Sequence, residues 1–444
     1  MQGVIQGLRT SSTAGDTSHG HGRGCGIRCR MLSSYNEGVP RRGCSFNFVH
    51  RKQPPRLFPP VSGITFSLSA GGWVWYNGSM TMKHALQGIC GVTGLAAMMF
   101  GGAAQALSGP APVDENLRDM RVADMPQYDV PKIDIKDNGQ HAKNIILMIG
   151  DGMGSEHLWA AWMLNRGKSF ILSMPVTGFS NTTSASDAVT DSAAAGTALA
   201  CGHKTNNHFL GVTPDKKPIE NLAEYYRAQG KATGLVVTKD ITDATPAAFY
   251  AHVDDRNKKK VIAQALVDAK FNVIYGGGGK TLSAEQKQAI ADAGTVAEFT
   301  HDGNPPAVAE RGEDYLCNYV SKALQELEKN PNGFFLMVEG SQIDHHAHNG
   351  KAAETLRETM DFDRAAGVVL QWMQHHPDTL LVVTADHQTG GLSIKRGNKD
   401  HGSVHVIFGT HSHTGFSVPV YAAGSGSSKF TGVLDNTEVS KLMR

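Results

Sequence analysis

Acidic and histidine side chains stand at the ends of three apolar runs in the sequence. The runs and their end residues are NIILMIG (144–150) before Asp151, FFLMVE (334–339) with Glu339 as its last residue, and TLLVVTA (379–385) before Asp386 and His387. In open α/β sheets, ligands bind beyond the carboxyl ends of the parallel strands. We therefore expect these side chains to gather at one edge of a sheet, where uncompensated charges would repel and desolvate one another.

Each of these signals also has an ordinary interpretation when it is taken alone. Asp151 stands between two glycines and could form a turn. Asp344 and His348 are four residues apart on one helical face, so they could be a solvated pair or two metal ligands. The segment HSHTG adds His411 and His413, and either of these could simply lie at the surface.

The joint pattern favours bound cations. Burial of the adjacent Asp386 and His387 without a cation would be costly, and the whole set of acids would be costly to gather unless metals neutralised it. Mixed histidine and carboxylate ligands suit zinc, whereas a set of oxygen ligands that includes Thr245 suits magnesium. The sequence therefore predicts a site with more than one metal ion.

Ser192 lies in the stretch VTDSAAAGTALACG (189–202), between an aspartate and a run of small residues. A serine hydroxyl needs a base or a metal to attack at neutral pH, and neither a Ser-His-Asp order nor a G-x-S-x-G elbow surrounds Ser192. A metal could activate it. A helix that begins here with small side chains would leave space for metals and for an anion at its N-terminus. The alternative is that Ser192 is a simple helix cap.

These motifs together resemble those of the alkaline phosphatase family. GDGMG, VTDSAA, DATPAA, VEGSQIDHHAH, TADH and HTG occur in the family's order over residues 144–444. The resemblance implies hydrolysis of phosphate monoesters to an alcohol and inorganic phosphate, through a phosphoserine, with two zinc ions and one magnesium ion. It implies these site residues: Ser192 as nucleophile; zinc at Asp344, His348 and His413; a second zinc at Asp151, Asp386 and His387; magnesium at Asp151, Thr245 and Glu339; and phosphate at Arg256.

Two positions mix patterns that differ between members of the family. Asp243, which the resemblance adds to the metal site, stands where some members have aspartate and others histidine. His345, a candidate substrate-binding residue, stands where some members have lysine and others histidine. This mixture leaves the third metal site and the pH optimum open, but it does not alter the expected reaction.

The order of apolar segments predicts the fold that must position these residues. Near-continuous apolar runs are typical of strands buried on both faces, and they alternate with segments of helical spacing. The expected strands are 144–149, 232–238, 271–276, 334–339 and 379–385, and the expected helices lie within 219–230, 315–329 and 354–374. We therefore predict an α/β catalytic domain over 144–444, with a largely parallel central sheet flanked by helices on both faces.

The charge balance gives no signal for an anionic macromolecule or membrane as a partner. Lysine plus arginine number 42 and aspartate plus glutamate number 41, so there is no net field to attract nucleic acid or an anionic membrane. Phosphate chemistry must therefore come from a local site, and small phosphomonoesters are the expected partners. The sequence is compatible with a homodimer.

Residues 80–106 have the features of a secretory signal peptide. MTMKH (80–84) is a short basic start, ALQGICGVTGLAAMMF (85–100) is an apolar region, and AQA (104–106) is a cleavage site of the A-x-A type. The apolar run is short for a membrane span, which needs roughly 20 residues; a retained anchor is the alternative. We therefore expect a periplasmic or secreted protein with no transmembrane segment after cleavage.

The rest of the N-terminal region has little of the patterning of a folded domain. Residues 1–79 precede the expected signal peptide, and we interpret them as the product of a misassigned start codon, with a disordered extension as the alternative. Residues 107–143 are polar and rich in proline, which predicts an arm or linker. After cleavage only Cys201 and Cys317 would remain, so at most one disulfide could form, and the sequence leaves their pairing open.

Two other functional classes fit part of the pattern. A related metal-dependent phosphodiesterase or sulfatase would use a similar sheet, but VTDSAA stands where a sulfatase needs its modification motif, and Arg256 suits a dianionic monoester. A secreted protein that binds metal or phosphate without turnover is disfavoured by the intact Ser192.

Overall fold

Residues 67–68, 74–75 and 118–444 are described in the computed structural model of this chain. The first two pieces are the short strands β1 (Ser67–Leu68) and β2 (Val74–Trp75), which pair antiparallel. The expected signal peptide at 80–106, the start of the expected arm and nearly all of residues 1–79 lie outside the described residues, so those predictions stand untested. Residues 118–444 contain all of the candidate site residues.

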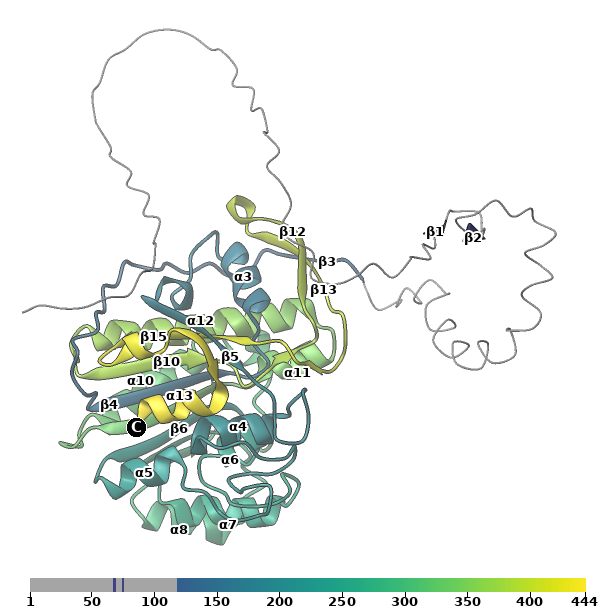
Figure 1. Ribbon diagram of the computed structural model, residues 1–444. Helices are drawn as coiled ribbons and strands as arrows, with labels where there is room; N and C mark the ends of the chain where they lie inside the picture. Colours follow the sequence, from purple (N-terminus) through teal and green to yellow (C-terminus); the bar gives the residue numbers. More distant parts are fainter. Residues whose placement is uncertain (1–66, 69–73, 76–117) are drawn as a thin grey trace, which may run out of the picture. The chain divides into compact units, whose positions relative to one another are not determined.

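A nine-stranded sheet forms the centre of this region (Figure 1). Strand β15 is antiparallel to both of its neighbours, and every other adjacent pair is parallel. In spatial order the strands are β16 (Gly432–Asp435), β5 (Val176–Asn181), β15 (Val418–Gly424), β10 (Thr379–Thr384), β4 (Asn144–Gly150), β9 (Phe334–Gly340), β6 (Ala232–Asp240), β7 (Val273–Gly277) and β8 (Val296–Phe299). The five strands expected from the apolar runs are β4, β6, β7, β9 and β10, so the prediction of a largely parallel sheet is confirmed.

Helices cover both faces of the sheet, which explains why its central strands are apolar throughout. Along β4, Leu147 and Ile149 pack into one core, whereas Ile146 and Met148 pack into another on the opposite face. The first core is closed by α4 (Ser192–Cys201), α5 (Leu222–Ala228), α6 (Ala244–Ala247), α7 (Lys259–Ala269), α8 (Ala284–Asp292) and α13 (Asn436–Met443). The second core is closed by α3 (Ser155–Leu164), α10 (Tyr315–Leu327) and α12 (Ala352–Met373).

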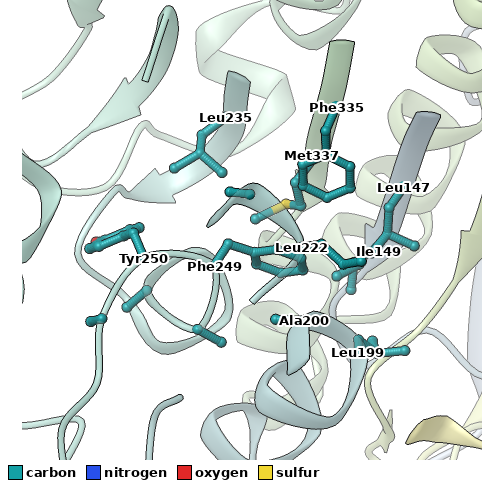
Figure 2. Packing of buried hydrophobic residues seen from close by; sticks show 14 of the residues in the cluster. Leu147, Ile149, Leu199, Ala200, Leu222, Leu235, Phe249, Tyr250, Phe335 and Met337 are labelled. Carbon is teal, nitrogen blue, oxygen red and sulfur yellow. The ribbon is translucent and has the colours of Figure 1, made fainter. Parts of the chain in front are cut away.

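Figure 2 shows how side chains from sheet and helices meet in the first core. Leu147, Phe335 and Met337 project from the sheet toward Leu199 on α4 and Phe249 just after α6. Phe249 stacks on Phe335, with ring centroids 6.0 Å apart. These contacts fix α4 and α6 against the sheet, and both helices carry residues of the candidate site.

Smaller elements form in segments that carry no clear apolar pattern. Strand β3 (Met120–Ala123), within the segment expected to be an arm or linker, joins β12 (Ser393–Asn398) and β13 (Ser403–Ile407) in an antiparallel sheet. The pair β11 (Gln388–Thr389) and β14 (His413–Thr414) is also antiparallel. The short helices α9 (Val308–Arg311) and α11 (Gln342–His348) complete the fold.

Two further observations bear on expectations from the sequence. Cys201 and Cys317 are both free, so no disulfide joins them. Within the described part of the chain, no helix has the length and apolar character that a membrane crossing requires.

Candidate active site

The carboxyl ends of three neighbouring central strands bring the predicted acids together. In the register of the sheet, Ile149 of β4 lies beside Glu339 of β9 and beside Thr384 of β10. Asp151 follows β4 by one residue and Asp386 follows β10 by two. The acids gather because adjacent parallel strands end at the same edge, as the sequence predicts.

Asp344, His348 and His413 form one group in which a cation could be held. His348 Nε2 lies 3.2 Å from Asp344 Oδ1 and 3.1 Å from His413 Nε2. His348 and Asp344 lie on α11, and His413 begins β14, 65 residues further along the chain. This is the first ligand set implied by the family resemblance.

Backbone carbonyls orient both histidines of this set. His348 Nδ1 donates to the carbonyl of His411 at 2.6 Å, and His413 Nδ1 donates to the carbonyl of Thr190 at 2.8 Å. A carbonyl only accepts, so in each ring Nδ1 carries the proton and Nε2 can offer its lone pair to a metal.

Asp151, Asp386 and His387 form a second group. His387 Nε2 lies 3.2 Å from Asp386 Oδ2 and 3.6 Å from Asp151 Oδ1. The Ser192 hydroxyl lies 3.1 Å from the same Nε2. The structure therefore places the predicted nucleophile against the second predicted ligand set.

The hydroxyl of Thr389 connects the two groups. It donates to Asp344 Oδ1 at 2.6 Å and lies 3.2 Å from His387 Nδ1. Because its single proton is used on Asp344, it accepts from His387 Nδ1 and leaves His387 Nε2 unprotonated. Gly152 makes room for this contact: it has φ +73°, and a Cβ there would lie 2.7 Å from Thr389 Oγ1.

Burial opposes negative charge on the acids unless cations are bound. It raises the pKa of Glu339 to about 8 and that of Asp386 to about 6. The pKa of Asp151 is also raised, by burial and then by the nearby Asp386 and Asp344. Burial alone would raise the pKa of Asp344 too, but hydrogen bonds with His348 and His413 lower it well below its usual range.

Several buried oxygen atoms of the site find no hydrogen-bond partner among the described residues. They are both carboxylate oxygens of Asp151 and of Glu339, Oδ2 of Asp386 and Oγ1 of Thr245. Buried polar atoms are normally paired, and metal ligation would satisfy these. Asp151, Thr245 and Glu339 together offer the oxygen donors that suit magnesium, and the residues of the two groups offer the mixed donors that suit zinc.

Helix α4 explains the run of small residues around Ser192. Asp191 is the N-cap, with its side chain accepting from the amide of Ala194 at 3.0 Å, and Ser192 is the first helical residue. The alternative in which Ser192 is the cap is therefore wrong, and its hydroxyl is left to face the metal groups. All ten residues of α4 are buried, and a Cβ at Gly196 would lie only 3.2 Å from Cβ of Ala248, which directly follows α6. The small residue therefore lets α4 pack closely against α6, which carries Thr245.

Arg256 is held by two acidic side chains. Its Nη1 donates to Asp191 Oδ2 at 3.1 Å, and its Nη2 lies 3.7 Å from Asp243 Oδ1. Asp243 belongs to neither metal group and is instead surrounded by cations, with Lys239 Nζ at 2.6 Å and Lys259 Nζ at 3.5 Å. His345, on α11, is exposed, and its ring packs on His346.

Sequence reasoning missed four residues that organise the site: Thr190, Asp191, Lys239 and Thr389. Thr190 and Thr389 act through a carbonyl and a hydroxyl whose partners lie far along the chain, so no local pattern marks them. Lys239 directly follows the apolar run 232–238. Residues that follow buried parallel strands lie at the ligand-binding edge of the sheet, as for Asp151 and Asp386, so the same rule points to Lys239.

Comparisons with known proteins identify the family of this chain. A family model described as alkaline phosphatase matches residues 142–304 and 300–407. The chain is 29% identical over 419 residues to alkaline phosphatase 4 of Bacillus subtilis (69% of this chain, 89% of the relative). It is 30% identical over 402 residues to alkaline phosphatase of Escherichia coli K12 (68% and 85%).

Solved structures give the same result. Alkaline phosphatase from the Antarctic bacterium TAB5 is similar with a TM-score of 0.64 at 31% identity, over 68% of this chain and 98% of that one. A variant of the TAB5 enzyme, solved with Mg bound in its M3 site, has the same TM-score at 29% identity, over 70% and 98%.

Proposed function

The chain belongs to the alkaline phosphatase family, and we propose that it hydrolyses phosphate monoesters through a phosphoserine on Ser192, with two zinc ions and one magnesium ion. One observation carries the proposal: the Ser192 hydroxyl lies 3.1 Å from His387 Nε2, within a buried group of metal-binding side chains. Nδ1 of His387 pairs with the Thr389 hydroxyl and not with a carboxylate, so Ser192 and His387 do not form a Ser-His-Asp triad, and a metal held by these side chains would activate the serine.

Two zinc ions and a magnesium ion would be held by the three sets of side chains described above, and they would supply positive charge for the oxygens that enter and leave phosphorus. In the first step, Ser192 Oγ forms a bond to phosphorus while the bond to the alcohol oxygen breaks, and the alcohol leaves with a proton. In the second step, water attacks the phosphoserine, which regenerates the Ser192 hydroxyl and releases inorganic phosphate.

Residues around Ser192 would position the phosphoryl group. The backbone amide of Ser192 lies in the first turn of α4, where an unpaired N–H and the helix dipole favour an anion. Arg256 offers a planar pair of donors for two phosphate oxygens, and Asp191 holds its guanidinium in place. A dianionic monoester matches this arrangement better than a diester, which has one negative charge.

The test compares three classes of ester on the zinc-loaded protein. We expect rapid release of the chromophore from an aryl phosphate monoester, and slow release from the corresponding diester and sulfate ester. Faster hydrolysis of the diester or the sulfate would overturn the proposed substrate class, and zinc binding without turnover of any ester would show a binding protein.

A further inference from the structure

One charged side chain beside the site has no role in the steps above. Lys239 lies near the end of β6, its side chain is 16% exposed, and its Nζ lies 2.6 Å from Asp243 Oδ2. Burial alone would lower the pKa of Lys239, but Asp243, Asp151 and Asp344 hold it above its usual range. The lysine is therefore a fixed positive charge inside the site.

The backbone of Lys239 is held next to the oxygen ligands. Two residues earlier, Val237 is paired in register with Glu339. The intervening Thr238 accepts from the amide of Ser341 at 2.9 Å through its hydroxyl, and from the Gln342 side chain at 3.0 Å through its carbonyl. The end of β6 is thus tied to the turn between Glu339 and α11.

Asp243 holds the Lys239 side chain in place. Asp243 is paired with three cations: Lys239 at 2.6 Å, Lys259 at 3.5 Å and Arg256 at 3.7 Å. Lys259 has a side chain that is 42% exposed and donates to the Thr242 carbonyl. The positive charge of Lys239 opposes the effect of burial on the pKa of Glu339, and Lys259 is not among the main influences on that group. Asp243 therefore anchors one buried and one outer lysine.

We propose that Lys239 is a further, protein-supplied cation of the site, a positioning residue whose charge partly neutralises Asp151 and Glu339 and so lowers the Mg²⁺ affinity of the set formed by Asp151, Thr245 and Glu339. This inference rests on the proposed function. It reassigns Asp243, which the family resemblance adds to the metal site, to the role of anchoring Lys239 and Arg256. A fixed ammonium near a divalent cation repels it strongly in a poorly solvated site.

The test is calorimetric titration of the zinc-loaded protein with Mg²⁺ alone. For Lys239→Met we expect Mg²⁺ affinity to rise at least about tenfold over the wild type. Two control variants keep the inner positive charge: Lys239→Arg retains it directly, and Lys259→Met removes only the outer lysine from the same carboxylate. The Mg²⁺ affinity of each control should stay within about threefold of the wild-type value.

Two results would overturn the proposal: unchanged Mg²⁺ affinity in Lys239→Met, or an equal rise in Lys259→Met. If Lys239→Met does not fold, Lys239→Gln provides the neutral variant. The Mg²⁺ affinities decide the role of Lys239 even if the wild-type protein hydrolyses no ester. A failure to hydrolyse any ester would refute the proposed function and leave the role of Lys239 to the titrations.

Discussion

Replacing Thr389 with valine removes the hydroxyl that connects the two metal-binding groups while keeping the shape of the side chain. The hydroxyl donates to Asp344 at 2.6 Å and accepts from His387 at 3.2 Å, in a fully buried position. Leaving buried polar partners unsatisfied costs about 1–3 kcal/mol. Loss of a group that orients a metal ligand typically lowers metal affinity about 10- to 100-fold. The two estimates agree, because about 1.4 kcal/mol corresponds to a factor of ten.

We therefore expect Thr389→Val to weaken zinc binding about 10- to 100-fold, and to recover much of its activity when zinc is in excess. Competition with a chromogenic chelator measures the affinity. Thr384→Val is the matched control, because Thr384 is equally buried and its hydroxyl donates to the Pro419 carbonyl at 2.9 Å and to no side chain of the metal groups. Equal zinc affinities for wild type and Thr389→Val would refute the assigned role of this hydroxyl.

Three further predictions follow from the same geometry. Ser192→Ala should lose most turnover but retain zinc measured by elemental analysis, since Ser192 belongs to neither ligand set; loss of the zinc would contradict this. Burial raises the pKa of Glu339 to about 8 from an ordinary value of 4.5, so the metal-free protein should become less stable as pH rises between these values. Thermal melting should show Glu339→Gln losing part of that dependence, and identical pH profiles would argue against it. His345→Lys should tighten inhibition by inorganic phosphate at alkaline pH, where histidine is neutral, and superimposable inhibition curves would leave His345 as a surface residue.

The central part of the fold could be predicted because its signals are local. Strands β4, β9 and β10 are buried at every position, and that burial is visible as uninterrupted apolar runs. The strands that follow β10 on one side of the sheet, β15, β5 and β16, carry weaker signals. Strand β5 alternates between buried and exposed residues, and β15 contains Pro419, which is unusual inside a sheet.

The candidate ligands could be predicted for a related reason, since a residue that follows a buried parallel strand must lie at the ligand-binding edge. The residues that orient these ligands could not be predicted from the sequence. Thr190 contributes only a carbonyl, to a histidine 223 residues away. Asp191 looks like a second acid of the site, yet its two oxygens cap α4 and hold Arg256. Such roles depend on tertiary contacts, which produce no periodic pattern in the sequence.

The proposed function depends on covalent phosphorylation of Ser192 during turnover. The most direct measurement is to quench the zinc-loaded protein during hydrolysis of a ³²P-labelled monoester and to locate the label by peptide mapping. We expect label on the peptide that contains Ser192, and none in the Ser192→Ala variant. Full activity with no covalent label, or label on another residue, would contradict it.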